Sequence, residues 1–439
     1  MNRCRQASPV FLFLGLLAAV ALSSLTVSAE DISNPAAQAN PVEESINSPL
    51  DLNSPGSVVD RLEEDEQPKE HLFQIPGVSR LLQPWYNLKD DLEKKYGFKY
   101  GISYTTFYQK ASDSFGPEDD AASYDLDISG TWTFYGRETP SPAMVGFDVF
   151  RRDTLGTDIP PQRLFTQYGG LYSGAAPYGE EDLVIGELWL QQKFNNVFGY
   201  RIGKIFPITA YDFFPFKNFR TDFVDFNHVT NAAIPLPGNG LGAFVQYRPH
   251  SRFMLRLGAH DANADVQESG FDTYDNELFT IFEIGMDTQL VPREPGRPPA
   301  GHVHLSFWHQ DRRKDAGIDD GQGVAISAVQ RFGKFSPFVR YGYADVNRDG
   351  PTPVKHMANT GLVVDGIFSQ NLDRIGIGYT WSDPADSTLD KQQTVDAYYR
   401  LQLTAEIQIG PTFEVIFDPI RNPDEDTIYV WGARARISM

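Results

Sequence analysis

The sequence predicts a large antiparallel transmembrane β-barrel of about sixteen strands, up to eighteen, preceded by one short helix. From Phe98 onward apolar and polar side chains alternate with a period of two, which is the period of a β-strand. Aromatic residues make up 13% of the chain and recur near the ends of the apolar faces, where membrane barrels carry aromatic girdles. Short turns alternate with long connections, as they do between the two mouths of such a barrel.

The first 29 residues indicate a secretory signal peptide, which is excluded from the fold. Arg3 and Arg5 precede the apolar run VFLFLGLLAAVAL, and Val-Ser-Ala at 27–29 fits a cleavage site. An uncleaved signal anchor is the alternative, although the run is short for a membrane span. The one cysteine, Cys4, lies in this peptide, so we expect no disulfide and no cysteine-ligated metal in the mature chain.

Residues 30–84 form an acidic, proline-rich preface. Such a composition buries too little apolar area to offset its ordering entropy, so we predict a largely disordered tether or linker. A short helix is predicted over 85–97. Asn87 suits its N-cap, Lys94 and Lys95 suit its last turn, and Gly97 suits its C-terminal end.

The barrel is predicted over 98–439. Sixteen spanning strands of roughly 9–11 residues would use about half of that length, and a barrel of this size encloses an aqueous channel. The last stretch, YVWGARARISM at 429–439, keeps its alternation to the final residue. We attribute this to barrel closure, because an unpaired backbone group in hydrocarbon costs several kcal/mol.

Charge and motifs exclude several classes of function. The formal net charge of −20 disfavours binding to nucleic acid, which needs a basic surface. The sequence contains no Gly-rich phosphate loop, no G-x-S-x-G and no H-E-x-x-H. We therefore expect no enzyme and no catalytic residue.

Several stretches resemble the carbohydrate-selective porins of Gram-negative outer membranes, the OprB-like family. They are FGYRIGKIFPITAYDFF, AAIPLPGNGLGAFVQYRP, DRIGIGYTWSDP and VDAYYRLQLTAEIQIGPTFEVIFDPIRNPDEDTIYVWGARARI, and the resemblance covers roughly Trp85 to Met439. It implies passive diffusion of mono- and oligosaccharides through a water-filled barrel in the outer membrane, without a cofactor. The implied partners are outer-membrane lipids, carbohydrate solutes and the barrel-assembly machinery, which engages the C-terminal strand; a homotrimer stays open.

Three alternatives stay open at this point. The first is a barrel of another class, namely a general or ion-selective porin. The second is a barrel lipase, which needs a serine and a histidine together at the lipid boundary; Ser306 and His304 face the lumen by alternation. The third is a soluble secreted sugar-binding β-protein.

Alternation places a set of side chains on the lumen face as candidates for the pore lining and for sugar selectivity. Arg256 and Arg400 fall mid-strand, where a constriction is expected, and the stretch 219–240 is a candidate in-folding loop. Trp308 is a candidate aromatic platform for a sugar ring, with packing under an inward loop as the alternative. The whole set is Arg201, Arg220, Asp222, Arg256, Glu283, Asp287, Trp308, Arg340, Arg400, Arg434 and Arg436.

One loop resembles half of a calcium site. Asp345, Asn347 and Asp349 in DVNRDG match the first half of a calcium-binding loop, but His356 stands where the bidentate acid is expected. A turn rich in Asp and Asn is the alternative. His302, two residues from His304, has no obvious third partner for a metal.

Overall fold

The computed structural model describes residues 52–66, 69, 71–73, 76–172, 174–175, 177–270, 274–288, 290, 301–368 and 373–439. The predicted signal peptide and the first part of the preface lie outside the described residues.

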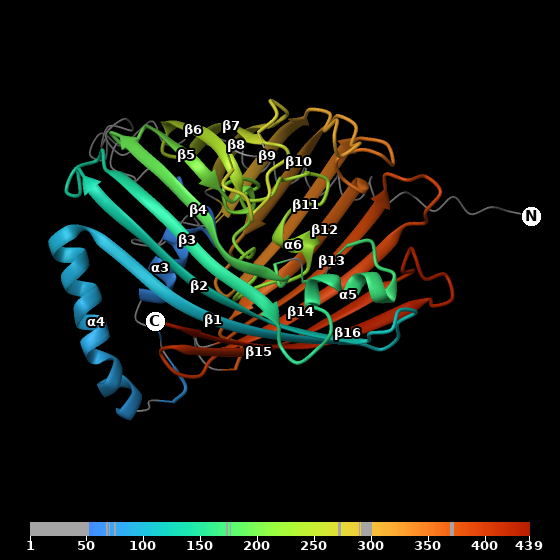
Figure 1. Cartoon of the computed structure of the whole chain (residues 1–439), viewed down its shortest axis with the longest axis horizontal. Helices are drawn as coiled ribbons and strands as arrows, with labels where there is room; N and C mark the ends of the chain where they lie inside the picture. The colour runs from blue at the N-terminus through green and yellow to red at the C-terminus, as the bar shows by residue number, and fades with distance from the viewer. Residues whose placement is uncertain are drawn as a thin grey trace, which may run out of the picture.

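Sixteen antiparallel strands form one closed barrel (Figure 1), which confirms the predicted fold class. Each strand pairs with the next along the chain, and the first pairs with the last. The strands are β1 Phe98–Ala111, β2 Asp120–Tyr135, β3 Ala143–Thr154, β4 Glu181–Phe194, β5 Phe198–Ile205, β6 Gly240–His250, β7 Phe253–Asp261, β8 Leu278–Thr288, β9 Gly301–Gln310, β10 Gly321–Gln330, β11 Phe335–Asp345, β12 Val354–Asp365, β13 Asp373–Pro384, β14 Gln392–Gln402, β15 Ile407–Phe417 and β16 Thr427–Ser438.

The barrel closes through the last residue of the chain. The N–H of Met439 donates to the carbonyl oxygen of Ile102 at 2.9 Å, and the N–H of Ile102 donates to that of Met439 at 3.0 Å. The register continues inward with Tyr104 opposite Ile437. The alternation of the C-terminal stretch is therefore explained by its pairing with β1.

The two mouths of the barrel differ in the length of their connections. Residues 195–197, 251–252 and 331–334 make short turns at the mouth where β1 begins, and the stretches 155–180 and 206–239 lie at the other. This is the predicted asymmetry. In outer-membrane barrels short turns face the periplasm and long loops face outward.

The burial pattern is the inverse of that of a water-soluble protein. Leu257 and Ile377 are 56% and 51% exposed on the outer face, whereas the charged Arg201 and Glu283 are fully buried on the inner face. Large aromatics are exposed near strand ends, among them Tyr135. Only lipid solvates such an outer face favourably, so the soluble sugar-binding alternative is wrong.

The described helices are α3 (Val58–Glu66), α4 (Pro76–Tyr96), α5 (Pro161–Tyr168), the single 3₁₀ turn η1 (Pro207–Thr209) and α6 (Phe226–Val229). None of the helices in the described ranges is long and apolar enough to cross a membrane.

Helix α4 begins earlier than the helix predicted over 85–97. It starts at Pro76 and continues through Pro84, which sequence reasoning takes as a boundary because proline removes a helical hydrogen bond. Contacts with the barrel hold it outside the short-turn mouth (Figure 1). The ring of Trp85 packs edge-on against Tyr100 at 5.0 Å between centroids, and the Tyr86 hydroxyl donates to Glu406 at 3.2 Å.

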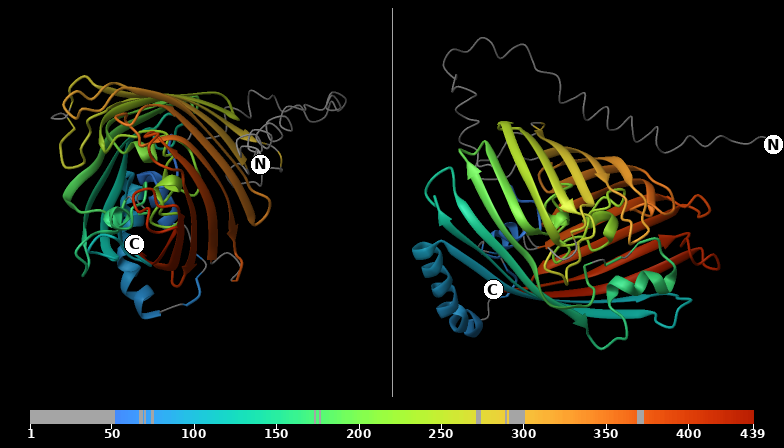
Figure 2. Two further views of the ribbon diagram at one scale, coloured as in Figure 1. Left: turned by 90° about the vertical axis from the view of Figure 1, so that its right-hand side faces the viewer. Right: turned by 45° about the horizontal axis from the view of Figure 1, so that its top comes forward.

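The prediction of a disordered preface over 30–84 is wrong for residues 52–66. These residues form an ordered segment that ends in α3, with Leu52, Val58 and Leu62 buried. Figure 2 shows α3, in blue, within the ring of strands. The apolar side chains are few, but the barrel wall supplies the surface that buries them.

Candidate functional site in the barrel lumen

Two segments fill much of the lumen. One is the stretch between β5 and β6, residues 206–239, here called the in-folded loop; the other is residues 52–66, here called the N-terminal segment. Most side chains of the in-folded loop are buried, and it lies inside the ring of strands in both views of Figure 2. The predicted in-folding of 219–240 is therefore confirmed, and the loop starts earlier than predicted.

Buried polar contacts fix the in-folded loop to the wall. The backbone N–H of Asp212 donates to Glu283 at 2.8 Å, and Arg340 pairs with the Asp212 carboxylate. On the opposite wall Arg434 donates to the carbonyl oxygens of Phe219 and Asp222 at 2.6 and 2.9 Å. These contacts make the loop part of the rigid lining.

Lys217 holds the loop together from within. Its ammonium group donates to the carbonyl oxygens of Ile208 and Tyr211, each at 2.6 Å. Burial lowers the pKa of Lys217 from 10.5 to about 8, against the attraction of Asp212. The loop thus carries a cation that burial disfavours.

The N-terminal segment contacts one wall through a buried cluster of charges. Arg61, at 4% exposure, lies 2.6 Å from Asp127 and 3.0 Å from Asp148. Arg220 of the in-folded loop lies 2.8 Å from both Asp127 and Asp125. Two arginines from the lumen segments thus pair with three carboxylates on β2 and β3.

The acidic end of the same segment contacts strands on the other side of β1, namely β14 and β16. Asp65 accepts two hydrogen bonds from Arg436, at 2.7 and 2.8 Å, and Glu64 lies 3.4 Å from Arg400. Burial alone would raise the pKa of Asp65, but Arg436 and Lys69 hold it well below its ordinary value. Asp65 is therefore ionised in the closed lumen.

A third set of contacts involves β5 and β7. Arg201 donates to the side-chain oxygen of Asn53 at 2.6 Å, and Arg256 donates to the carbonyl oxygen of Leu52 at 3.4 Å. Leu52 packs with Trp189 and Trp308 in one apolar cluster. The N-terminal segment therefore contacts one arc of the wall, which runs from β14 and β16 past β1 to β7.

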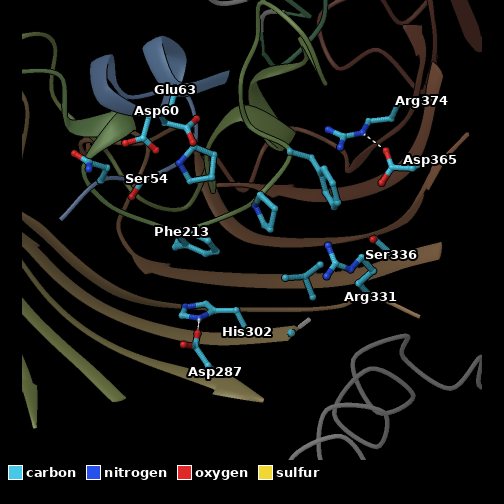
Figure 3. Close-up of a pocket in the computed structure, with 16 residues that line it drawn as sticks. Ser54, Asp60, Glu63, Phe213, Asp287, His302, Arg331, Ser336, Asp365 and Arg374 are labelled. Carbon is cyan, nitrogen blue, oxygen red and sulfur yellow. Dashed lines mark hydrogen bonds and ion pairs between the residues drawn. The ribbon is translucent and has the colours of Figure 1, made fainter. Parts of the chain in front are cut away.

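A cavity of about 320 Å³, here called the chamber, lies beside these segments at the short-turn mouth. Asp60 and Glu63 of α3 and Phe213 of the in-folded loop line one side of it, as Figure 3 shows. The opposite side comes from strand ends and turns of the wall, namely Asp287, His302, Arg331, Ser336, Asp365 and Arg374.

The wall of the chamber carries two charge pairs. His302 Nδ1 lies 2.9 Å from Asp287, and Arg374 lies 2.6 Å from Asp365. The Phe213 ring lies 4.6 Å from the His302 ring between centroids. The Phe213 ring thus packs against the wall beside these charge pairs, at the edge of the chamber.

The chain is similar to known porins in sequence and in fold. Residues 322–439 match the model of the OprB family, carbohydrate-selective porins. The porin AaxA of Chlamydia pneumoniae is 22% identical over 325 residues, which is 71% of each chain. The high-pH structure of Pseudomonas putida OprB superposes with a TM-score of 0.62 at 14% identity, over 81% of this chain and 97% of that one.

The chain is an outer-membrane porin that resembles the carbohydrate-selective OprB family over residues 322–439. These matches confirm the predicted resemblance and fold class, and they support the predicted carbohydrate-porin function and outer-membrane location. The family match and the fold indicate a channel.

The porin places the predicted lining residues on the inner face or in the in-folded loop, but most of them bind protein groups. Arg201, Arg256, Arg400 and Arg436 contact the N-terminal segment. Arg340 and Arg434 hold the in-folded loop, Glu283 binds its Asp212, and Arg220 and Asp222 belong to the loop itself. Asp287 alone among the predicted set lines the chamber.

Trp308 is not an exposed platform. Its side chain is 3% exposed and packs in the apolar cluster with Tyr211 and Ile234 of the in-folded loop. Trp308 therefore packs under an inward loop, which was the alternative to a sugar platform. The loop covers the ring face that a sugar would need.

Sequence reasoning missed most of the chamber. Asp60 and Glu63 lie in the stretch predicted to be disordered, and Arg331 and Arg374 lie in a turn and at a strand start, outside the alternating strand centres. The aromatic cluster in YDFFPF, which contains Phe213, was an available signal.

Ser306 and His304 face the lumen, as predicted. Both bind Glu283, at 3.1 and 2.9 Å, and both are 1% exposed. They lie away from the lipid boundary, where a barrel lipase would need them.

In the described part of the chain no group of three His, Cys, Asp or Glu residues has the geometry for a metal. The Asn347 side chain accepts a hydrogen bond from the Asp349 N–H at 2.8 Å and donates to Asp319 at 3.2 Å. This is the turn geometry that an Asp- and Asn-rich loop adopts.

Proposed function

We propose that this porin carries mono- and oligosaccharides across the outer membrane by passive diffusion, through a passage that includes the chamber. The chamber supports this proposal best. Its volume of about 320 Å³ lies at the lower end of the roughly 300–1,000 Å³ of small-molecule sites, which suits sugars of one or two rings.

The chemistry of the lining suits sugars. Arg331, Ser336 and the carboxylates of Asp60 and Glu63 can exchange hydrogen bonds with hydroxyl groups, and Phe213 can pack against the C–H face of a ring. Selectivity in a pore arises from its diameter and from the donors and acceptors that line it. Diffusion of this kind requires no cofactor and no catalytic group.

Liposome swelling with sugars of graded size tests the proposal. Glucose-sized sugars should enter porin vesicles faster than empty vesicles, and the rate should fall as the sugar grows. The variant Arg61→Gln should loosen the packing of the lumen and serves as a second test. The proposal is wrong if glucose enters neither wild-type vesicles nor Arg61→Gln vesicles faster than it enters empty vesicles. A strong preference for small ions over glucose would instead favour an ion-selective porin.

Assembly and calcium binding are further parts of the proposal. We expect the assembly machinery to recognise the C-terminal strand β16, and native electrophoresis will distinguish a homotrimer from a monomer. Calcium binding at Asp345, Asn347 and Asp349 stays a prediction, which isothermal titration with calcium would test.

A further inference from the structure

We propose that the lumen contains an arginine site for sugars that carry a carboxylate, such as uronates, and that the N-terminal segment closes this site in the resting channel. Glu64 and Asp65 would occupy the positions that a substrate carboxylate takes when the segment withdraws. This proposal rests on the proposed function of sugar diffusion.

The proposed sugar site consists of four arginine side chains that lie close together. Arg220, Arg400, Arg434 and Arg436 line one small cavity of about 10 Å³, together with Gln408. That volume is about the size of one water molecule. Arginine presents a planar fork of donors that matches a carboxylate, so several arginines around one space are suited to an anionic or polyhydroxylated ligand.

The N-terminal segment supplies the anions that now face this site. Asp65 binds Arg436 in the bidentate geometry of a carboxylate and a guanidinium, at 2.7 and 2.8 Å, and Glu64 lies 3.4 Å from Arg400. The carboxylate of a uronate offers the same pair of acceptor oxygens. Asp222 also lies 3.7 Å from Arg400 and belongs to the fixed in-folded loop, so it would stay when the segment leaves.

The N-terminal segment is attached to the barrel by fewer backbone hydrogen bonds than the wall strands are, so we expect it to move more readily. It reaches the wall through side chains and pairs with no strand of the barrel, whereas each strand carries ladders of backbone hydrogen bonds on both sides. Ion pairs that become hydrated when they separate contribute little net free energy. Because the segment lacks backbone pairing with the wall, we expect local opening to begin there, against the burial of Leu52, Val58, Leu62 and Arg61.

The path of the chain allows withdrawal towards the short-turn mouth. Residues 72 and 73 donate backbone hydrogen bonds to the carbonyl oxygens of Gln402 and Leu403, at 3.2 and 2.8 Å, at that mouth. Helix α4 follows and is held outside the barrel by Tyr86 and Glu406. Residues 52–66 thus enter from the mouth where the chain is anchored, and they can leave without crossing the barrel.

Close contacts at two glycines define the closed position of the N-terminal segment. A Cβ atom at Gly101 would lie 3.0 Å from Leu62 Cδ2, and one at Gly56 would lie 3.7 Å from the Cβ of Asn218. The second separation is that of a disulfide, roughly 3.5–4.5 Å between Cβ atoms. A cysteine pair at positions 56 and 218 can therefore lock the segment to the in-folded loop.

The first experiment compares the entry of glucuronate and of glucose into vesicles, because the two sugars differ in charge but little in size. In Asp65→Asn the ratio of glucuronate to glucose entry should rise several-fold over wild type. Asp90→Asn removes an exposed pair with Lys94 on α4 and should leave the ratio unchanged. Adding Arg400→Gln to Asp65→Asn should abolish the gain, because Arg400 belongs to the site.

The second experiment uses the double variant Gly56→Cys/Asn218→Cys, with thiol labelling to confirm the disulfide. The oxidised protein should lose glucuronate entry while glucose entry persists through the chamber, and reduction should restore it. Gly56 has φ of +81°, so Gly56→Cys alone controls for backbone strain.

Three results would overturn the inference. They are an equal rise of glucose and glucuronate in Asp65→Asn, no difference between Asp65→Asn and Asp90→Asn, and identical entry in the oxidised and reduced double variant. Wild-type glucose entry at the level of empty vesicles would instead overturn the proposed function, so the two failures are distinguishable.

Discussion

Asp65 and Arg436 form a partly buried bidentate pair that joins the N-terminal segment to the closing strand β16, at 2.7 and 2.8 Å. The two residues lie at opposite ends of the described chain. Their pairing means that the segment folds onto a lumen wall that exists only when β16 has closed the barrel.

The first prediction concerns acid. Because Arg436 holds the pKa of Asp65 well below its ordinary value of 3.8, the pair stabilises the closed lumen fully above about pH 4 and loses this contribution only as pH falls through the lowered pKa. Planar-bilayer conductance should therefore show no opening through this pair between pH 7 and pH 5. Opening within that range which Asp65→Asn abolishes would contradict the prediction.

The second prediction concerns alkali and Lys217. Burial lowers its pKa to about 8 from 10.5, so the folded loop binds this proton less tightly than the unfolded chain. Below pH 8 Lys217 is protonated in both the folded and the unfolded state, so the cost of burying its charge lowers the free energy of unfolding in full. Between pH 8 and 10.5 the folded state loses the proton first, and the free energy of unfolding rises by about 3 kcal/mol at most. Wild-type porin should thus gain stability over this range.

The midpoint of heat modification on gels, measured from pH 7.5 to 10.5, checks this gain. Lys217→Met should lose most of the rise, although it also loses three hydrogen bonds to carbonyl oxygens. A variant whose midpoint rises as much as that of wild type would show that another group titrates.

The third prediction tests the lipid face. Leu257 lies mid-strand in β7 and is 56% exposed on the outer face, whereas Leu183 lies near the start of β4 and is 69% exposed. Leu257→Arg should cost roughly 2–4 kcal/mol, as at the bilayer midplane, and Leu183→Arg about 0–1 kcal/mol, as near the interface. Urea titration of folding into vesicles measures both, and equal costs would argue against this placement of the membrane.

Much of the fold follows from alternation because lipid and water impose opposite demands on neighbouring side chains. Alternation therefore assigned Arg201, Arg436 and Trp308 to the inner face. It could not assign their partners, because these depend on the paths of residues 52–66 and 206–239 through the lumen. The acidic stretch of α3 looked disordered since its counter-charges, such as Arg400 and Arg436, lie hundreds of residues away in sequence.

The fourth prediction tests the chamber. Phe213 lines the chamber, and its ring packs against that of His302 at 4.6 Å between centroids. Phe213→Ala should widen the chamber, so disaccharides should enter faster and the ratio of glucose to maltose entry should fall. Phe282→Ala, on the exposed outer face, should leave the ratio unchanged. A falling ratio in both variants would point to a general loosening of the barrel.

The fifth prediction separates packing from sugar binding at Trp308. The side chain is 3% exposed among Ala325, Ala344 and residues of the in-folded loop. Trp308→Ala should therefore lower the free energy of unfolding by about 3–5 kcal/mol, as for large buried side chains, while Trp308→Phe should cost much less. Both variants that fold should keep the wild-type order of preference among sugars in liposome swelling. A change in that order with unaltered stability would mean that Trp308 contacts the solute, and that the in-folded loop leaves its ring during transport.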